Sequence, residues 1–217
     1  MKYLLAFVSF LYYCQNVIKC QQNATNVKID VYYETLCPDS IQFIRQKLYP
    51  TFGKIGEIMD INLIPYGKAE HTQYREDVEI YCHHGSKECE GNTIQSCAIK
   101  YLDNNMTIVL PFVNCMENRF YGRYRPHIST IANECAITHG INYTQIQSCS
   151  ASLEGKRLHI KNGERTQRLS PKLTFVPWVV INDAFTETDQ NVALYGDFKT
   201  LVCDKYQGKT PPNSCNS

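Results

Sequence analysis

The first alternation of apolar and polar residues along the chain predicts a β-strand. Over residues 27–33, Val, Ile and Tyr are interleaved with Lys and Asp, and this period of two indicates a half-buried strand. Over residues 38–49 the apolar positions recur at helical spacing, with a proline suited to the first turn and Pro50 expected to end the helix. Apolar residues return over 58–64. The sequence therefore predicts an opening strand, helix and strand, with Cys37 at the start of the helix.

The rest of the chain divides into a cysteine-rich stretch and a second α/β segment. Residues 66–169 have a mostly helical pattern, which we interpret as a large insertion held by disulfides. The apolar run 175–182 predicts a strand, followed by a turn at Asn182-Asp183 and a short strand over 184–186. Residues 191–206 predict a closing helix. The predicted α/β core comprises about residues 27–65 and 170–206, and the insertion about residues 66–169.

Composition favours one secreted globular domain. A chain of 217 residues with 43% apolar content can bury a full core.

Lys2 precedes an apolar run over 3–13, which has the length of a signal-peptide core and is short of the ~20 residues that span a bilayer. We predict a signal peptide over 1–20, a single domain over 21–217 and no transmembrane segment. Without Lys2 and Lys19 the 22 basic residues become 20, against 21 acidic ones, so the charge does not indicate nucleic-acid binding.

Three sequons agree with passage through the secretory pathway. Asn23, Asn105 and Asn142 each begin an Asn-x-Thr triplet, so all three are predicted N-glycosylation sites. Eleven cysteines also favour an oxidising compartment. The predicted location is therefore extracellular, with the lysosome as the alternative.

The number of cysteines singles out Cys37. Removing Cys14 and Cys20 with the leader leaves nine, which is odd. If eight of the nine form four disulfides, Cys37 is the remaining thiol. The sequence leaves the pairing open, although Cys203 and Cys215 make a plausible C-terminal pair. The predicted framework consists of Cys82, Cys89, Cys97, Cys115, Cys135, Cys149, Cys203 and Cys215.

Residues 37–40, Cys-Pro-Asp-Ser, stand where thioredoxin-type enzymes carry a C-x-x-C dithiol. In such a site the first thiolate attacks a substrate disulfide, and the second thiol then releases the product. Ser40 cannot perform this second step, because a hydroxyl forms no stable bond to sulfur. A helix N-terminus favours the thiolate of Cys37, the charge of Asp39 opposes it, and Ser40 can donate a hydrogen bond to it. The alternative is that Cys37 is simply a small buried apolar residue.

A longer motif makes a family resemblance specific. From Cys82 the chain reads Cys-His-His-Gly-Ser-Lys-Glu-Cys-Glu-Gly-Asn and then reaches Cys97. This stretch resembles the C-Q-H-G-x-x-E-C-x-x-N-x-x-x-x-C signature of gamma-interferon-inducible lysosomal thiol reductases, and only His83 departs from it. Shorter blocks around residues 31–34, 65–67, 176–179 and 201–209 resemble the same family.

The resemblance implies a thioredoxin-like fold with a helical insertion, a glycosylated secretory chain, and reduction of protein disulfides in acidic endolysosomal compartments. The two catalytic cysteines of the family fall on Cys37 and Ser40, so only the first carries over. Val176-Pro177 resembles the cis-proline turn that flanks the active site in thioredoxin-like proteins. Pro177 is therefore expected to help hold a substrate strand beside Cys37.

The signature residues include the atom types of a zinc site as well as those of disulfides. Cys82, His83, His84, Cys89 and Cys97 offer sulfur and nitrogen atoms, yet their spacings form no paired C-x-x-C arrangement, and oxidised cysteines do not ligate metals. We therefore expect structural disulfides, with both histidines as loop or packing residues, no metal and no other cofactor.

Three functional hypotheses follow from these residues. The leading one is a secreted pseudoenzyme that lacks dithiol reductase activity and acts by binding protein partners of unknown identity. The alternative is a single-cysteine thiol reductase or isomerase, in which Cys37 attacks and an external small thiol such as glutathione resolves the mixed disulfide. A third hypothesis brings another cysteine close to Cys37, which the odd count disfavours because one framework thiol would be left unpaired.

Overall fold

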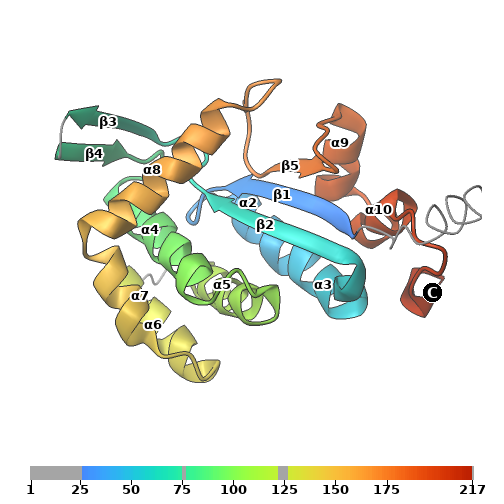
Figure 1. The fold of residues 1–217 in the computed structure, drawn as a ribbon, viewed down its shortest axis with the longest axis horizontal. Coiled ribbons are helices and arrows are strands. Elements are labelled where there is room, and N and C mark those ends of the chain that lie inside the picture. The colour runs from blue at the N-terminus through green and yellow to red at the C-terminus, as the bar shows by residue number, and fades with distance from the viewer. Residues whose placement is uncertain (1–25, 75–76, 122–126, 217) are drawn as a thin grey trace, which may run out of the picture.

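The computed structural model describes residues 26–74, 77–121 and 127–216. The predicted leader, with Cys14 and Cys20, and the sequon at Asn23 lie outside these ranges. The described elements (Figure 1) are β1 Val27–Tyr33, α2 Pro38–Phe43, a π-helix Ile44–Leu48, α3 Tyr49–Ile55, a 3-10 turn Gly56–Ile58, β2 Met59–Pro65, β3 Glu70–Tyr74, β4 Asp77–Tyr81, α4 Ser86–Tyr101, α5 Met106–Phe120, α6 Ile128–Thr138, α7 Tyr143–Ser150, α8 Leu153–Gln167, β5 Trp178–Ile181, α9 Glu187–Tyr195, α10 Phe198–Lys205 and a 3-10 turn Asn213–Cys215.

Strand β1 is the middle strand of a three-stranded sheet in the order β2-β1-β5. It pairs in parallel with β2 and antiparallel with β5. Parallel neighbours need a crossover connection, and the continuous helical segment from α2 to α3 supplies it. The predicted opening strand, helix and strand are therefore confirmed.

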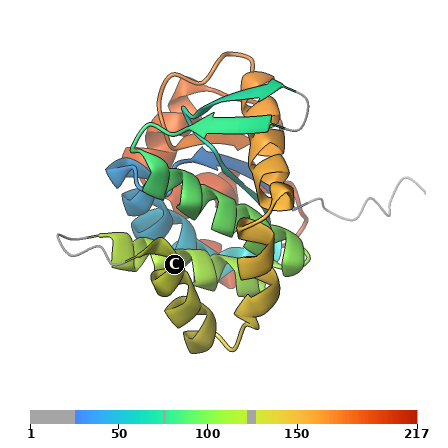
Figure 2. The same cartoon turned by 90° about the vertical axis from the view of Figure 1, so that its left-hand side faces the viewer.

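Of the described elements, the two-stranded hairpin of β3 and β4 and the helices α4 to α8 lie between β2 and β5. The hairpin packs against α8, as Figures 1 and 2 show. Disulfides join α4 to α7 through Cys97–Cys149 and α5 to α6 through Cys115–Cys135. Within the described residues, every helix is too short or too polar to cross a membrane.

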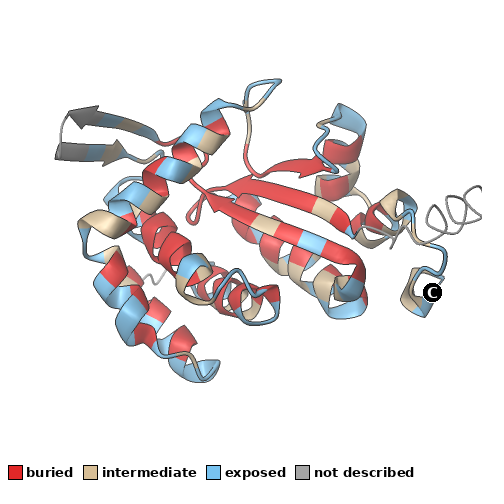
Figure 3. Cartoon of the chain, in the orientation of Figure 1, coloured by how far each residue is buried: buried red, intermediate tan, exposed pale blue. Residues whose placement is uncertain are grey.

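The sheet is covered on both faces because β1 alternates between two buried clusters. Ile29, Val31 and Tyr33 belong to the main core, together with residues of α2 and α3 and of the insertion helices α4 to α7. Tyr32 belongs to a smaller cluster with Trp178. Figure 3 shows that buried residues line β1, β5 and the helix sides that face them. The start of the helix that follows β1 is thus held between the sheet and the insertion.

The prediction that Pro50 ends the first helix is wrong. The chain stays helical to Ile55, through a π-helix at residues 44–48 in which the Tyr49 N–H bonds the Ile44 carbonyl. A proline lacks an N–H and its ring collides with the carbonyl four residues earlier in a regular α-helix. The wider π turn just before Pro50 relieves that collision, so the helix continues.

Two predictions for the C-terminal segment are also wrong. The region 191–206 forms two helices, because α9 ends at its C-cap Gly196 and Asp197 caps α10 by accepting a hydrogen bond from Thr200 N–H at 3.2 Å. Residues 184–186 form no second strand, only a single bridge between Ala184 and Ile181. The turn itself lies where predicted, at Asn182 and Asp183, both with positive φ.

Candidate functional site

Cys37 lies at the N-cap of α2, directly after the turn that follows β1. Its backbone N–H donates to the Glu34 carbonyl at 3.3 Å, and its own carbonyl accepts from Ile41 N–H at 3.0 Å. The side chain is only 8% exposed. Its Sγ lies 3.9 Å from the Val176 carbonyl oxygen, and the Val176-Pro177 peptide bond is cis. The fold therefore brings the predicted nucleophile and the predicted cis-proline turn together.

Ser40 is fully buried below Cys37, in the first turn of α2. Its Oγ accepts a hydrogen bond from the Glu34 N–H at 3.4 Å. The hydroxyl therefore has a structural partner in the turn that leads to Cys37. It does not supply a second sulfur.

Burial raises the pKa of the Cys37 thiol above its ordinary value. Hydrogen bonds from the backbone N–H groups of Ser40 and Asp39, and from the Ser40 hydroxyl, lower it, but they do not cancel the desolvation. The charge of Glu34 also raises the Cys37 pKa. That the Asp39 charge opposes the thiolate stays a prediction. The neutral thiol is the favoured form of Cys37.

The signature residues on α4 support the turn before Cys37. Asn92 Oδ1 accepts from the Thr35 N–H at 3.1 Å, and the Thr35 hydroxyl donates to the Glu88 carbonyl at 3.3 Å. A Cβ on Gly91 would lie 2.6 Å from Thr35 Oγ1, so this glycine permits the close approach. Glu88 and Asn92 are fully buried. The role of these α4 residues is thus to hold the backbone between β1 and Cys37.

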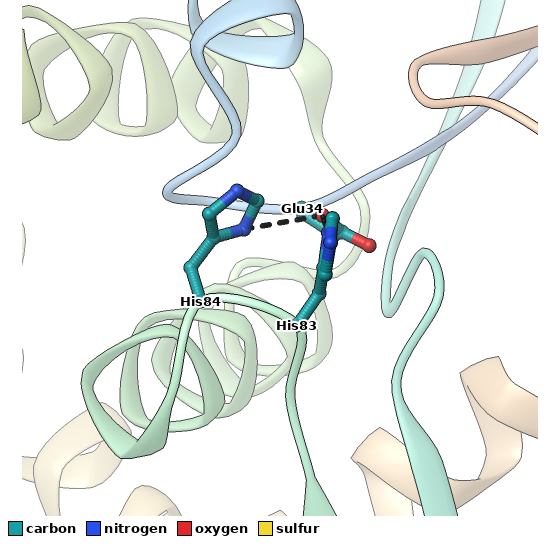
Figure 4. A group of neighbouring side chains, drawn as sticks. All are labelled: Glu34, His83 and His84. Atoms are coloured by element: carbon teal, nitrogen blue, oxygen red, sulfur yellow. Dashed lines mark hydrogen bonds and ion pairs between the residues drawn. The ribbon is translucent and has the colours of Figure 1, made fainter.

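Glu34, three residues before Cys37, is the central side chain that sequence reasoning missed (Figure 4). It is fully buried, and its Oε1 accepts from the Lys68 N–H at 2.6 Å. Its Oε2 lies 3.3 Å from Nδ1 of both His83 and His84. An unusual glutamate at the end of a buried strand was the available signal, but its partners are far away in the sequence.

A second buried carboxylate joins this group. Glu88 Oε2 lies 2.6 Å from His84 Nδ1, and Glu88 Oε1 accepts from the His84 N–H at 3.0 Å. Burial, and then the negative charge of Glu34, raise the pKa of Glu88, while the contacts with His84 act in the opposite direction. The sequence predicted His83 and His84 as loop or packing residues, yet both rings face Glu34.

All eight framework cysteines are paired in the structure. The disulfides are Cys82–Cys89, Cys97–Cys149, Cys115–Cys135 and Cys203–Cys215. Cys37 is the free cysteine of the described chain. The signature cysteines are therefore oxidised and offer no thiolate to a metal.

Two neighbouring surface hollows share lining residues, and one of them reaches α2. A hollow of about 460 Å³ is lined by Phe175 and Trp178, which flank the Val176-Pro177 turn, and by Leu194 and Tyr195 of α9. A smaller hollow shares Phe175, Leu194 and Tyr195 and reaches Asp39 and Gln42 of α2. Apolar and aromatic side chains thus adjoin the helix that carries Cys37.

The two described sequons lie on the surface of the insertion. Asn105 is the N-cap of α5 and Asn142 the N-cap of α7, and each Oδ1 accepts from the N–H two residues later at 3.1 Å. Both side chains are exposed. Their amide nitrogens are not needed for capping.

Comparisons with known proteins converge on one family. A family profile described as gamma interferon inducible lysosomal thiol reductase (GILT) matches residues 28–139. GILT-like protein 1 of Drosophila melanogaster is 32% identical over 226 residues, covering 100% of this chain and 88% of the relative. A gamma-interferon-inducible lysosomal thiol reductase of Carassius auratus is 32% identical over 201 residues, covering 91% and 76%.

One solved structure supports the fold alone. The crystal structure of a candidate protein disulfide isomerase from Nitrosomonas europaea superposes with a TM-score of 0.54 at 11% identity, covering 74% of this chain and 87% of that one. Together with the β2-β1-β5 sheet and its helical crossover, this similarity confirms the predicted thioredoxin-like fold.

Proposed function

Because the chain belongs to the gamma-interferon-inducible lysosomal thiol reductase family, we propose that it is a secreted member that has lost dithiol reductase activity and acts by binding other proteins. The observation that carries this proposal is Ser40, fully buried at the position of the resolving thiol. Its hydroxyl oxygen accepts a hydrogen bond from the Glu34 N–H, so this position holds a bonded oxygen in place of a second sulfur.

The cysteine pairing supports the loss of dithiol chemistry. Cys37 is the free thiol among the described residues, and the other eight cysteines are all in disulfides. A framework cysteine could resolve a mixed disulfide only by giving up its own bridge. The raised pKa of Cys37 further lowers the population of the attacking thiolate.

The surface that adjoins α2 supports a binding role. Tyr195 is 76% exposed at the rim shared by the two hollows, next to Phe175 and Leu194. Aromatic side chains with accessible faces are enriched at protein interfaces. A loop or extended segment of a partner protein is the ligand class that such a shallow apolar surface suits.

The proposal that the protein is secreted rests on its four disulfides. Four disulfides require a compartment that does not reduce them, as the secretory pathway provides. A lysosomal destination is the alternative, favoured by the names of relatives such as the Carassius auratus lysosomal thiol reductase.

The decisive experiment measures turnover of a disulfide substrate, with and without glutathione, at acidic and neutral pH. The mature protein is compared with Cys37→Ala and Ser40→Cys. We expect turnover without glutathione only in Ser40→Cys, and partner binding that is unaffected by Cys37→Ala. Glutathione-independent turnover by the natural protein contradicts the loss of dithiol activity, and strict dependence of binding on the thiol contradicts the binding role.

A second function is favoured by the position of Cys37 Sγ beside the Val176 carbonyl and the cis-proline turn. In this single-cysteine mechanism the Cys37 thiolate bonds to one substrate sulfur, and the other leaves as a thiolate. One glutathione thiolate then displaces the bound substrate sulfur, and a second frees Cys37 and leaves as glutathione disulfide. This function predicts trapped Cys37 adducts and turnover that needs glutathione, and the absence of both rules it out.

A further inference from the structure

A carboxylate and two histidines meet beside the turn that leads to Cys37, and their spacing suits a metal ion. Oε2 of Glu34 lies 3.3 Å from Nδ1 of His83 and 3.3 Å from Nδ1 of His84 (Figure 4), and the three ligand atoms all lie within 4.8 Å of one another. A tetrahedral zinc ion holds nitrogen and oxygen ligands at about 2.0–2.1 Å, which places neighbouring ligand atoms about 3.4 Å apart. Two of the three distances already match that geometry.

Glu34 is held in the orientation that a metal ligand needs. Its Oε1 accepts a hydrogen bond from the Lys68 N–H at 2.6 Å, so Oε2 is the oxygen left to face the histidines. Gly67, with φ of 62°, lies so close that a Cβ would stand 2.2 Å from Glu34 Cγ. Fixing a ligand through its second oxygen is the arrangement that tunes metal sites in proteins.

The site is anchored on one side and open on the other. The Glu34 side chain is fully buried, whereas the His84 side chain is 31% exposed and the His83 side chain 52% exposed. An ion can therefore enter from solvent past the histidines. Three protein ligands and an open fourth position are the arrangement of zinc sites that keep a bound water.

The groups around Glu34 also favour the binding of a cation. Glu34 and Glu88 are both fully buried, and the ion pairs that the described structure shows for them are with histidines, not with lysine or arginine. Imidazole nitrogen with carboxylate oxygen is a ligand set that zinc accepts.

We propose that Glu34, His83 and His84 bind one Zn²⁺ ion, with the fourth position open to water. This site uses none of the signature cysteines, which are oxidised to disulfides. His83 is the position where the chain departs from the family signature, which has glutamine there. The proposal uses no thiol, so it stands or falls separately from the proposed function.

The test is a calorimetric Zn²⁺ titration of the mature, fully oxidised protein after removal of metal with a chelator, at slightly alkaline pH. We expect one ion per chain. His83→Gln, which restores the family residue, should weaken binding by at least about tenfold, since even outer-shell changes cost that much. His139→Gln, which removes an exposed histidine elsewhere, and Cys37→Ala should bind as the natural protein does.

The same experiment contains the results that overturn the proposal. Absence of binding to the folded natural protein overturns it, and so does equal affinity in His83→Gln. Loss of binding in Cys37→Ala, with binding kept in His83→Gln, assigns the metal to the thiol instead. Circular dichroism shows whether His83→Gln is folded, which its half-exposed ring leads us to expect.

Discussion

Cys37 Sγ lies 3.9 Å from the carbonyl oxygen of Val176, a residue 139 positions later in the chain. This contact joins the start of the first helix to the cis-proline turn at Pro177. Three positions along the same helix, Ser40 is buried and bonded to the Glu34 N–H. The structure therefore places a thiol beside the cis-proline turn and a hydroxyl one turn further along the helix.

Alkylation should show that Cys37 is a weakly reactive thiol. Because burial raises its pKa, less thiolate is present at neutral pH than in an unfolded peptide, and iodoacetamide should react more slowly. The rate, followed by mass spectrometry against pH, should rise with a midpoint above that of a cysteine peptide. Ser40→Ala should slow the reaction further, since the Ser40 hydroxyl lowers the Cys37 pKa. A rate already at its plateau near neutral pH contradicts this prediction.

His159 should make the fold less stable in acid. Burial, with a smaller effect of the His71 charge, lowers its pKa from 6.5 to about 4. The pKa of His159 is lower in the folded than in the unfolded chain, so the unfolded chain takes up the proton first as the pH falls. The stability of the fold is therefore undiminished by His159 above pH 6.5 and decreases as the pH falls toward about 4. The shift corresponds to about 3 kcal/mol.

Urea unfolding of the natural protein and of His159→Phe at both ends of that pH range measures the effect. Phenylalanine keeps a ring beside Tyr66, whose ring centre lies 5.3 Å from that of His159, but it cannot titrate. The variant should lose about 3 kcal/mol less stability on acidification. Equal losses in the two proteins would show that His159 is not responsible.

Gly67→Ala should be much more destabilising than Gly140→Ala. Both glycines have positive φ, at 62° and 66°, so alanine costs about 1 kcal/mol of backbone strain at either position. At Gly67 the new Cβ would also lie 2.2 Å from Glu34 Cγ, whereas nothing lies within 4 Å at Gly140. Overpacking adds about 1–3 kcal/mol at Gly67. The free energy of unfolding in urea measures both, and similar values would contradict the close packing of Gly67 on Glu34.

Removal of the Cys97–Cys149 disulfide should cost more stability than removal of Cys203–Cys215. The two bridges close segments of 52 and 12 residues, for which chain entropy predicts about 4 and about 3 kcal/mol. Cys97 and Cys149 are also buried in the core, at 0% and 2% exposure, so their loss leaves a cavity. Paired alanine variants, unfolded in urea, should keep this order, and the reverse order would count against the entropic argument.

The elements that depend on local residue patterns could be predicted, and those that depend on packing could not. The strand over 27–33 and the helix from Pro38 follow from apolar spacing, and the structure contains both. The helix continued past Pro50 because a π turn made room for the proline ring, a backbone adjustment that no apolar period reveals. The break at Asp197 had a local signal, since Gly-Asp before an apolar helix is a typical start.

The sequence by itself determined the strand-helix-strand opening, the odd number of cysteines and the absence of a second thiol after Cys37, because each follows from residue types at short spacing. Only the tertiary structure decided which groups lie beside the turn that leads to that thiol. Glu34 and His83 stand 49 positions apart, and they meet because α4 packs against the turn after β1 through Thr35 and Asn92. Contacts of this kind depend on how elements pack in three dimensions, which the order of residues along one element does not encode.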